Sequence, residues 1–482
     1  MSETTPLLAA TDNRIQANNA NIAGPEGWRH ESWVLLKTSA PVSLAYMLQN
    51  SLQTASVLIV GWMGPDELAA AAFAFMFAMV TAWCMALGSA TALDTLCSQA
   101  WTGASDKREI GIHLQRALLC MSLMFVPVAA LWWSAEPVLR ALGQEPQLAE
   151  NAALFLRWLT LGAPGYIYFE ATKKFLQAQG IMDAGSYVLM IASPINVLLN
   201  YLFVWHPAFA LGFIGAPIAT SITYWLMLCL LVLYIVYIDG MAGWGGWNRK
   251  ACTNLHSFMS LALPGIFMVS TEWWAFEIVA LAAGLLGRVP LAAQSVIMTT
   301  DQVINTLPFG ISIATSNRIG NLLGLALPAK RPRMSALASA GVASGVGGVL
   351  MVAMWLSREK FGYLFSDEKE VIELVSEVMP WVAMFQVADG LAASCGGSLR
   401  GMGRQHVGAA VNVFAYYVIA LPLGFLFAFR MGFGLEGLWI GQCIALFLVG
   451  ILELIVVFRT NWNAEIEICQ ERIRLGEVLP SH

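Results

Sequence analysis

Charged residues are scarce in this chain. Only 12% of its 482 residues are Asp, Glu, Lys or Arg, whereas 58% are hydrophobic, and an average soluble protein carries about 25% charged residues. The formal net charge of −5 also offers no basic face for a phosphate backbone. The composition excludes an ordinary cytosolic enzyme, a disordered protein and a nucleic-acid-binding protein, and indicates a chain surrounded mainly by lipid.

Paired cysteines and membrane-embedded histidines are lacking too. The eight cysteines form no CxxC pair and have no His at metal-ligand spacing, so we expect neither disulfides nor a metal site. All six histidines fall in predicted loops, at the edges of apolar runs or in the terminal segments. A membrane-embedded protease or transferase usually needs His, Ser or paired Asp at depth. We therefore expect a protein that is not an enzyme and has no cofactor.

Long apolar runs are what the chain has instead. A membrane helix needs about 20 mostly apolar residues, whereas the strands of a membrane barrel have about 10 and alternate strictly. Twelve runs of helical length occur, at residues 35–62, 68–93, 117–135, 152–170, 185–205, 211–238, 258–286, 291–315, 334–357, 371–395, 407–429 and 434–458. The first 30 residues are polar and contain no apolar core, so we expect no cleavable signal peptide. The sequence predicts an all-α membrane protein with twelve helices.

Lys and Arg are distributed unevenly between the loops. With the N-terminus in the cytosol, 19 of the 26 Lys and Arg residues fall in cytosolic segments, 6 fall on the other side, and one lies within the fourth run. Cytosolic loops of membrane proteins carry an excess of these residues. The distribution supports twelve spans and predicts a multi-pass protein with both termini in the cytosol.

Residues recur at an interval of 222 or 223 positions. The matched pairs include Pro41 and Pro264, Gly64 and Gly287, Gly180 and Gly403, and Gly212 and Gly434. Six helices is an even number, so both copies enter the bilayer in the same direction, as in the parallel repeats of secondary transporters. We expect a cytosolic tail (1–34), a first lobe of six helices (35–238), a cytosolic linker (239–257), a second lobe of six helices (258–458) and a cytosolic C-terminal tail (459–482), with a transport pathway between the lobes.

Four acids lie inside the predicted helices of the second copy. They are Glu272 and Glu277 in the seventh, Asp301 in the eighth and Asp389 in the tenth. The equivalent positions of the first copy hold Gln49, Thr54, Ala78 and Tyr166. A carboxylate in the hydrocarbon region is costly and normally marks function, and the first copy does without these charges. We interpret the four acids as functional.

A structural alternative stays open for each acid, since it can pair with a buried donor or extend to an interface. Glu277 follows Glu272 by five residues, about 140° around a helix, so the two do not share one narrow face. Glu453 in the last run and Asp94 at the end of the second are interpreted as structural or interfacial.

A carboxylate removed from water tends to hold a proton, because burial disfavours its charged form. A cationic substrate favours the ionised form, so proton and cation compete for one group, which is the basis of antiport. Each unit of pH difference supplies about 1.4 kcal/mol per proton, enough for roughly tenfold accumulation of a monovalent cation.

Aromatic and polar residues are candidates for the lining of a substrate cavity. Aromatic faces attract organic cations, but they also pack helices and form interfacial belts. Polar pairs one helical turn apart either line a cavity or hold helices together. The candidates are Gln49, Gln53, Trp273, Trp274, Asn305, Gln386 and Tyr416.

Several stretches of this sequence are familiar. They are residues 92–100 (ALDTLCSQA), 175–180 (FLQAQG), 272–277 (EWWAFE), 292–295 (AAQS), 318–321 (RIGN) and 399–405 (LRGMGRQ). Together they make the chain similar to the multidrug and toxic compound extrusion (MATE) family, particularly its eukaryotic branch, over roughly residues 35–460.

The resemblance implies a V-shaped transporter of two six-helix lobes that exchanges protons for organic cations or amphipathic metabolites. It makes Glu272 the main proton and substrate carboxylate, Glu277 the second acid of the same motif, and Asp389 and Asp301 the acids of the tenth and eighth helices. Bacterial relatives use acids of the first lobe and sodium. No matching mid-span acid occurs here, which argues against sodium coupling.

The N-terminal stretch Glu3–Leu8 has the ExxxLL form of a sorting signal, which suggests a vacuolar or endolysosomal membrane, with the plasma membrane as the alternative. We expect a monomer whose partners are its small cationic substrates and membrane lipid. The main rival is a flippase for lipid-linked substrates on a related scaffold. A basic central cavity would favour that rival, whereas the mid-span charges here are acidic.

Overall fold

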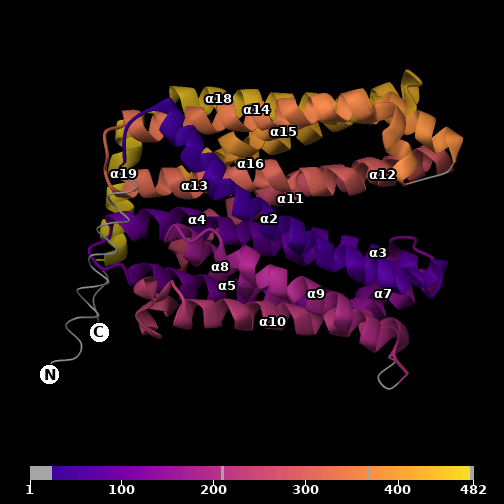
Figure 1. Ribbon diagram of the computed structural model, residues 1–482, viewed down its shortest axis with the longest axis horizontal. Helices are drawn as coiled ribbons and strands as arrows, with labels where there is room; N and C mark the ends of the chain where they lie inside the picture. The colour runs from indigo at the N-terminus through magenta and orange to yellow at the C-terminus, as the bar shows by residue number, and fades with distance from the viewer. Residues whose placement is uncertain (1–23, 208–210, 366–367, 478–482) are drawn as a thin grey trace. The chain divides into compact units, whose positions relative to one another are not determined.

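The computed structural model describes residues 24–207, 211–365 and 368–477. This part of the chain is helical and contains no strand (Figure 1). The ExxxLL stretch lies outside the described residues. The all-α prediction is confirmed, and the long apolar helices described below make this a multi-pass integral membrane protein.

The chain forms two compact units. The N-unit comprises Leu44–Cys97 and Asp106–Ile266, and the C-unit comprises the described parts of Met1–Ser43, Ser98–Ser105 and Phe267–His482. The predicted lobes, 35–238 and 258–458, have different limits, because residues 35–43 and 98–105 pack with the C-unit. Helices α2 (Trp28–Gly61) and α4 (Cys84–Gly103) therefore contribute to both units.

The N-unit is built from the end of α2 and most of α4 together with the helices that lie between and after them. These are α3 (Pro65–Ala78), the π-helical turn η1 (Met79–Trp83), α5 (Glu109–Trp133), α6 (Ala135–Ala141), α7 (Pro146–Leu159), α8 (Ala163–Ala178), α9 (Ala184–Trp205) and α10 (Gly215–Tyr237), with short 3-10 turns at Gly212–Ile214, Met241–Gly243 and Arg249–Cys252.

The C-unit contains the second set of helices. These are α11 (Leu255–Leu286), α12 (Arg288–Ile304), α13 (Thr306–Gly324), α14 (Lys330–Phe361), a 3-10 turn at Gly362–Leu364, α15 (Lys369–Met402), α16 (Gln405–Asn412), the π-helical η6 (Val413–Ala420), α17 (Leu421–Phe425), the π-helical η7 (Leu426–Arg430), α18 (Gly434–Arg459) and α19 (Trp462–Glu477). The first residues of α11 belong to the N-unit.

The twelve predicted runs correspond to these helices in order. Among the described residues, nine helical segments are long and apolar enough to cross a membrane by themselves. The other three predicted spans are α2, the pair α7 and α8, and the pair α12 and α13. The two pairs are spans interrupted near their middle: α7, α8 and α12 are each shorter than 18 residues, and α13 has 19 residues but is too polar to qualify alone.

The interruption between α12 and α13 lies at Asn305. Pro308, in the first turn of α13, has no backbone N–H and cannot continue the hydrogen-bond ladder of α12. The ends of the two helices are nevertheless joined, because the Asn305 backbone N–H donates to the Asp301 carbonyl at 2.8 Å. A mid-membrane break of this kind exposes polar groups where they line a cavity.

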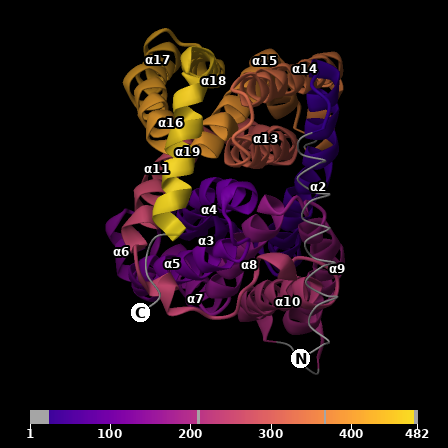
Figure 2. The same cartoon turned by 90° about the vertical axis from the view of Figure 1, so that its left-hand side faces the viewer.

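Helix α15 is the central element of the C-unit and packs against α13, α14 and α18 (Figure 2). Glycine permits the closest approaches. A Cβ atom added to Gly390 would lie 2.5 Å from the Ala343 carbonyl oxygen of α14, and one added to Gly397 would lie 2.3 Å from the Ser312 carbonyl oxygen of α13. Small residues at such crossings let membrane helices pack backbone against backbone, which fixes α15 between its neighbours.

Replacing Gly390 with Ala is expected to destabilise the protein by about 1–3 kcal/mol, because the new methyl group meets backbone atoms that have no room to move. Gly341 of α14 is the matched control, since a Cβ there meets no atom within 4 Å. Thermal unfolding in detergent should show a lower midpoint for G390A and an unchanged or higher one for G341A. Equal midpoints would contradict this description of the packing.

Candidate functional site

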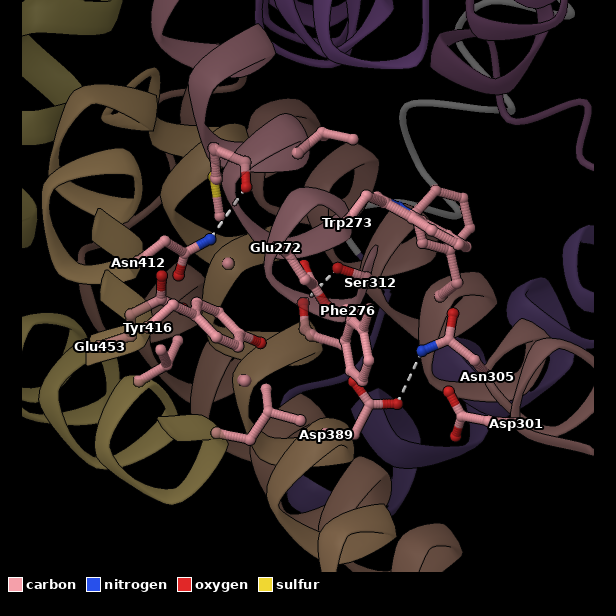
Figure 3. Close-up of a pocket in the computed structure, with 18 of the residues that line it drawn as sticks. Glu272, Trp273, Phe276, Asp301, Asn305, Ser312, Asp389, Asn412, Tyr416 and Glu453 are labelled. Carbon is pink, nitrogen blue, oxygen red and sulfur yellow. Dashed lines mark hydrogen bonds between the residues drawn. The ribbon is translucent and has the colours of Figure 1, made fainter. Parts of the chain in front are cut away.

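The C-unit contains an internal pocket lined by four acids, which are labelled in Figure 3, and by one base. The acids are Glu272 of α11, Asp301 of α12, Asp389 of α15 and Glu453 of α18, and the base is Arg400 of α15. The cavity has a volume of about 80 Å³, which is room for several water molecules. Five charged side chains from four helices therefore converge on one small polar space.

Glu272 reaches the pocket because of its place on α11. Its companions in the lining are Met268, Val269, Trp273 and Phe276, and this spacing is one face of an α-helix. Glu272 is near the middle of a helix that runs from Leu255 to Leu286 and is partly buried. The apolar and aromatic neighbours hold its carboxyl group at the edge of the cavity.

The two aspartates are held by amide side chains. Asn305 Nδ2 donates to Asp389 Oδ2 at 2.9 Å (Figure 3), and Gln386 Nε2 donates to Asp301 Oδ1 at 3.0 Å. Asp301 and Asp389 are 6% and 3% exposed. Asn305 contacts Asp389 because the break between α12 and α13 places it there. Neutral donors orient both carboxyl groups without cancelling their charge.

Arg400 is the one basic residue of the lining. One of its terminal nitrogens donates to Ser312 Oγ at 2.6 Å, and it lies close enough to interact electrostatically with both Glu272 and Glu453. Within the described residues, none of the four acids forms an ion pair with Lys, Arg or His. One positive charge thus faces four carboxyl groups.

Several predicted site residues do meet at this pocket. Glu272, Asp301, Asp389, Trp273, Asn305 and Tyr416 all line it. Gln386 lies behind Asp301, 1% exposed, and acts through the hydrogen bond described above. In the described part of the chain, no group of three or more His, Cys, Asp or Glu residues is arranged to hold a metal ion.

Other predicted site residues lie elsewhere. Glu277 and Trp274 are outside the lining, and Trp274 is 39% exposed. The helical geometry explains both, because neither residue falls on the face of α11 that carries Glu272. Gln49 and Gln53 lie on the part of α2 that belongs to the N-unit. Gln49 donates to Glu170 Oε1 at 3.0 Å and to the Tyr166 hydroxyl at 2.9 Å.

The N-unit contains buried charges that the sequence interpretation missed. Glu170 and Lys173 of α8 are 0% and 2% exposed and form an ion pair of 2.8 Å. Asp94 and Lys174, also buried, form a second pair of 3.0 Å, which agrees with a structural role for Asp94. Both lysines lie beyond the end of the fourth predicted run (152–170), but the structure places them inside helix α8. Each buried acid of these pairs has its own lysine, in contrast to the acids of the pocket.

Two charged residues of the pocket were missed. Arg400 lies beyond the end of the tenth predicted run (371–395) and was not a site candidate, and Glu453 was interpreted as structural or interfacial. Both line the cavity, and Glu453 is fully buried. A comparison of the two copies of the repeat could have identified both Arg400 and Glu453. At the intervals that relate the two copies, Glu453 corresponds to Leu231 and Arg400 to Gln177, so both are charges that the first copy lacks.

The sequence matches the MatE family model twice, over residues 41–202 and 264–426. The two matches begin 223 residues apart, which confirms the predicted duplication. An uncharacterised transporter of Schizosaccharomyces pombe is 38% identical over 93% of this chain and 83% of its own length. Multidrug and toxin extrusion protein 2 of Mus musculus is 34% identical over 93% of this chain and 77% of its own length.

Solved structures agree with these similarities. The crystal structure of a eukaryotic MATE transporter, AtDTX14, superposes with a TM-score of 0.87 at 28% identity and covers 93% of this chain and 100% of that one. A Vibrio cholerae MATE transporter superposes with a TM-score of 0.79 at 16% identity over 93% of this chain and 99% of that one, a likeness of fold alone. The twelve-helix arrangement in two lobes agrees with these structures.

Replacing Lys173 with Met is expected to destabilise the protein by about 3–5 kcal/mol, because it leaves the Glu170 charge buried without its partner. The double variant Glu170→Gln with Lys173→Met removes both charges and should recover most of the loss. Thermal unfolding in detergent measures both effects. A single variant as stable as the wild type, or a double variant less stable than the single one, would contradict the pairing.

Proposed function

The chain belongs to the MatE family of multidrug and toxic compound extrusion transporters, and on that premise we propose that it is a proton-coupled antiporter that exports organic cations by alternating access. It is a membrane transporter and not an enzyme. The observation that carries the proposal is the set of four acids around one cavity of the C-unit, none of them in an ion pair within the described residues.

The shortage of positive charge at the pocket is what supports exchange, because one arginine faces four carboxyl groups there. A buried carboxylate that is bonded to its own lysine, as Glu170 is, has no need of a proton or a foreign cation. The pocket acids have amide donors or none, so their negative charge is balanced by whatever cation enters the cavity. A proton and a cationic substrate then compete for the same oxygen atoms, and binding of one releases the other.

Glu272 is the best placed of the four acids to hold the substrate. It is only partly buried, whereas the other three are almost fully enclosed. Trp273, Phe276 and Tyr416 also line the pocket, and the faces of aromatic rings attract organic cations. Asp301 and Asp389 add negative charge that makes the cavity more favourable for any cation. This chemistry fits an organic cation better than a small anion.

The energy source is the proton gradient. At a difference of one pH unit, each exchanged proton supplies about 1.4 kcal/mol, which supports roughly tenfold accumulation of a monovalent cation. Glu277 lies on α11 with Glu272 but does not line the pocket, and we assign it an auxiliary role in proton binding. The cavity-lining role predicted for Gln49, Gln53 and Trp274 stays a prediction.

The substrate class follows from the relatives in part. The mouse relative is named for multidrug and toxin extrusion, and we extend that class to this chain as organic cations and amphipathic metabolites. A flippase for anionic lipid-linked substrates would need a basic cavity, whereas here four acids surround a single arginine. We also propose that the protein is a monomer with both termini in the cytosol, in the vacuolar, endolysosomal or plasma membrane.

Replacing Glu272 with Gln is expected to abolish proton-driven exchange while leaving the protein folded, because the amide keeps the shape of the side chain and loses the charge. The measurement is uptake of tetraethylammonium by proteoliposomes under an imposed pH gradient. Glu373→Gln, a change at an exposed acid of α15 that does not line the pocket, should exchange normally. Wild-type rates in the Glu272 variant would reject the coupling role of this residue.

A further inference from the structure

Glu453 is a buried acid that the proposed exchange does not yet use. Its side chain is fully enclosed, and neither carboxyl oxygen has a hydrogen-bond partner in the described part of the chain. An ionised carboxylate without donors costs several kcal/mol in such surroundings. The carboxyl group is therefore most stable in these surroundings when it carries a proton.

Two glycines leave space beside the carboxyl group of Glu453. A Cβ atom added to Gly396 of α15 would lie 3.5 Å from Glu453 Oε2, and one added to Gly408 of α16 would lie 3.2 Å from Oε1. The same added atoms would come within 2.8 Å of the Met268 side chain of α11. Three helices thus leave a space at the carboxyl group that side chains at 396 or 408 would fill.

Among the titratable groups near Glu453, Arg400 is the one with a positive charge. Arg400 and Cys395 of α15, Glu272 of α11 and Tyr416 of η6 are the titratable groups that interact with it. Of these, only Arg400 carries a positive charge, and Arg400 interacts with Glu272 as well. The single guanidinium group of Arg400 therefore interacts with both Glu272 and Glu453, and its one positive charge can balance only one of them.

Glu453 and Asp301 lie at opposite ends of the labelled group, with Glu272 and Tyr416 between them (Figure 3). Glu453 is six residues before Arg459, the last residue of α18, and Arg400 is two residues before Met402, the last residue of α15. The pair therefore occupies the part of the pocket nearest the C-terminal ends of these two helices. The substrate acids Asp301 and Asp389 are farther from those ends.

We propose that Glu453 is a second proton-binding group of the pocket and that it acts on Glu272 through Arg400. When Glu453 holds a proton, Arg400 balances Glu272 and opposes binding of a cation there. When Glu453 gives its proton to water in the cavity, its carboxylate attracts Arg400, and the charge of Glu272 becomes available to the substrate. This inference rests on the proposed antiport and assigns it a further residue.

Binding of tetraethylammonium to the purified full-length protein at two pH values tests this inference. Glu453→Gln imitates the protonated state, so it should weaken binding about tenfold near pH 8 and leave the weak binding near pH 5 unchanged. Glu453→Asp should keep the pH dependence. Glu436→Gln is the matched control, because Glu436 is on the same helix, bonds to Trp381 Nε1 at 2.7 Å and does not line the pocket.

A second change separates this role from a structural one. Adding Arg400→Gln to Glu453→Gln removes the charge that opposes the cation at Glu272, so the double variant should bind at pH 8 within about threefold of the wild type. A double variant as weak as the single one, or a Glu453→Gln variant with wild-type binding at both pH values, would overturn the proposal.

Proteoliposome exchange by the wild type keeps the two proposals distinct. If the wild type exchanges tetraethylammonium for protons and Glu453→Gln binds like the wild type, only the role of Glu453 fails. If the wild type shows no proton-driven exchange with any cation of a broad panel, the antiport itself fails, whatever the binding data show.

Discussion

The cost of a carboxylate that is enclosed by apolar helices governs the chemistry of this protein. Such a charge is stable only with a counter-ion, with good hydrogen-bond donors, or with a proton. The N-unit uses the first solution, since Glu170 and Asp94 have lysine partners. The pocket of the C-unit uses amide donors for its aspartates and gives its glutamates one shared arginine. Charge that stays unbalanced in this way is what a transporter needs for exchange.

The two copies of the repeat differ in their buried charges while keeping a common frame. The family model matches each copy separately, so the helices of both are built on one plan. In the C-unit, charged residues occupy positions where the first copy has neutral ones, such as Glu453 opposite Leu231. Glycine crossings at α15 hold the frame rigid around these charges. The two copies therefore share one plan of helices and differ in the buried charges that each carries.

Much of this fold was predictable because a helix that crosses lipid needs about 20 mostly apolar residues, and such runs are easy to recognise in a sequence. Twelve apolar runs, the bias of Lys and Arg, and the interval of 223 residues were all visible without a structure. The interrupted spans were not, because the break at Asn305 depends on a proline in the next helix and on the packing around Asp389. The burial of Lys173 and Lys174 was hidden for a related reason, since a charge near the end of an apolar run looks exposed until its buried partner is known.

The pocket was predictable only in part. Mid-helix acids pointed to Glu272, Asp301 and Asp389, but Arg400 and Glu453 lie near helix ends, where charge is ordinarily interfacial. The central claim is that protons and organic cations compete for these carboxyl groups. The most direct measurement is proton release when tetraethylammonium is added to the purified protein in weakly buffered detergent solution at neutral pH. The claim predicts saturable acidification by the wild type and much less by Glu272→Gln, and saturable binding of the cation by the wild type without any proton release would contradict it.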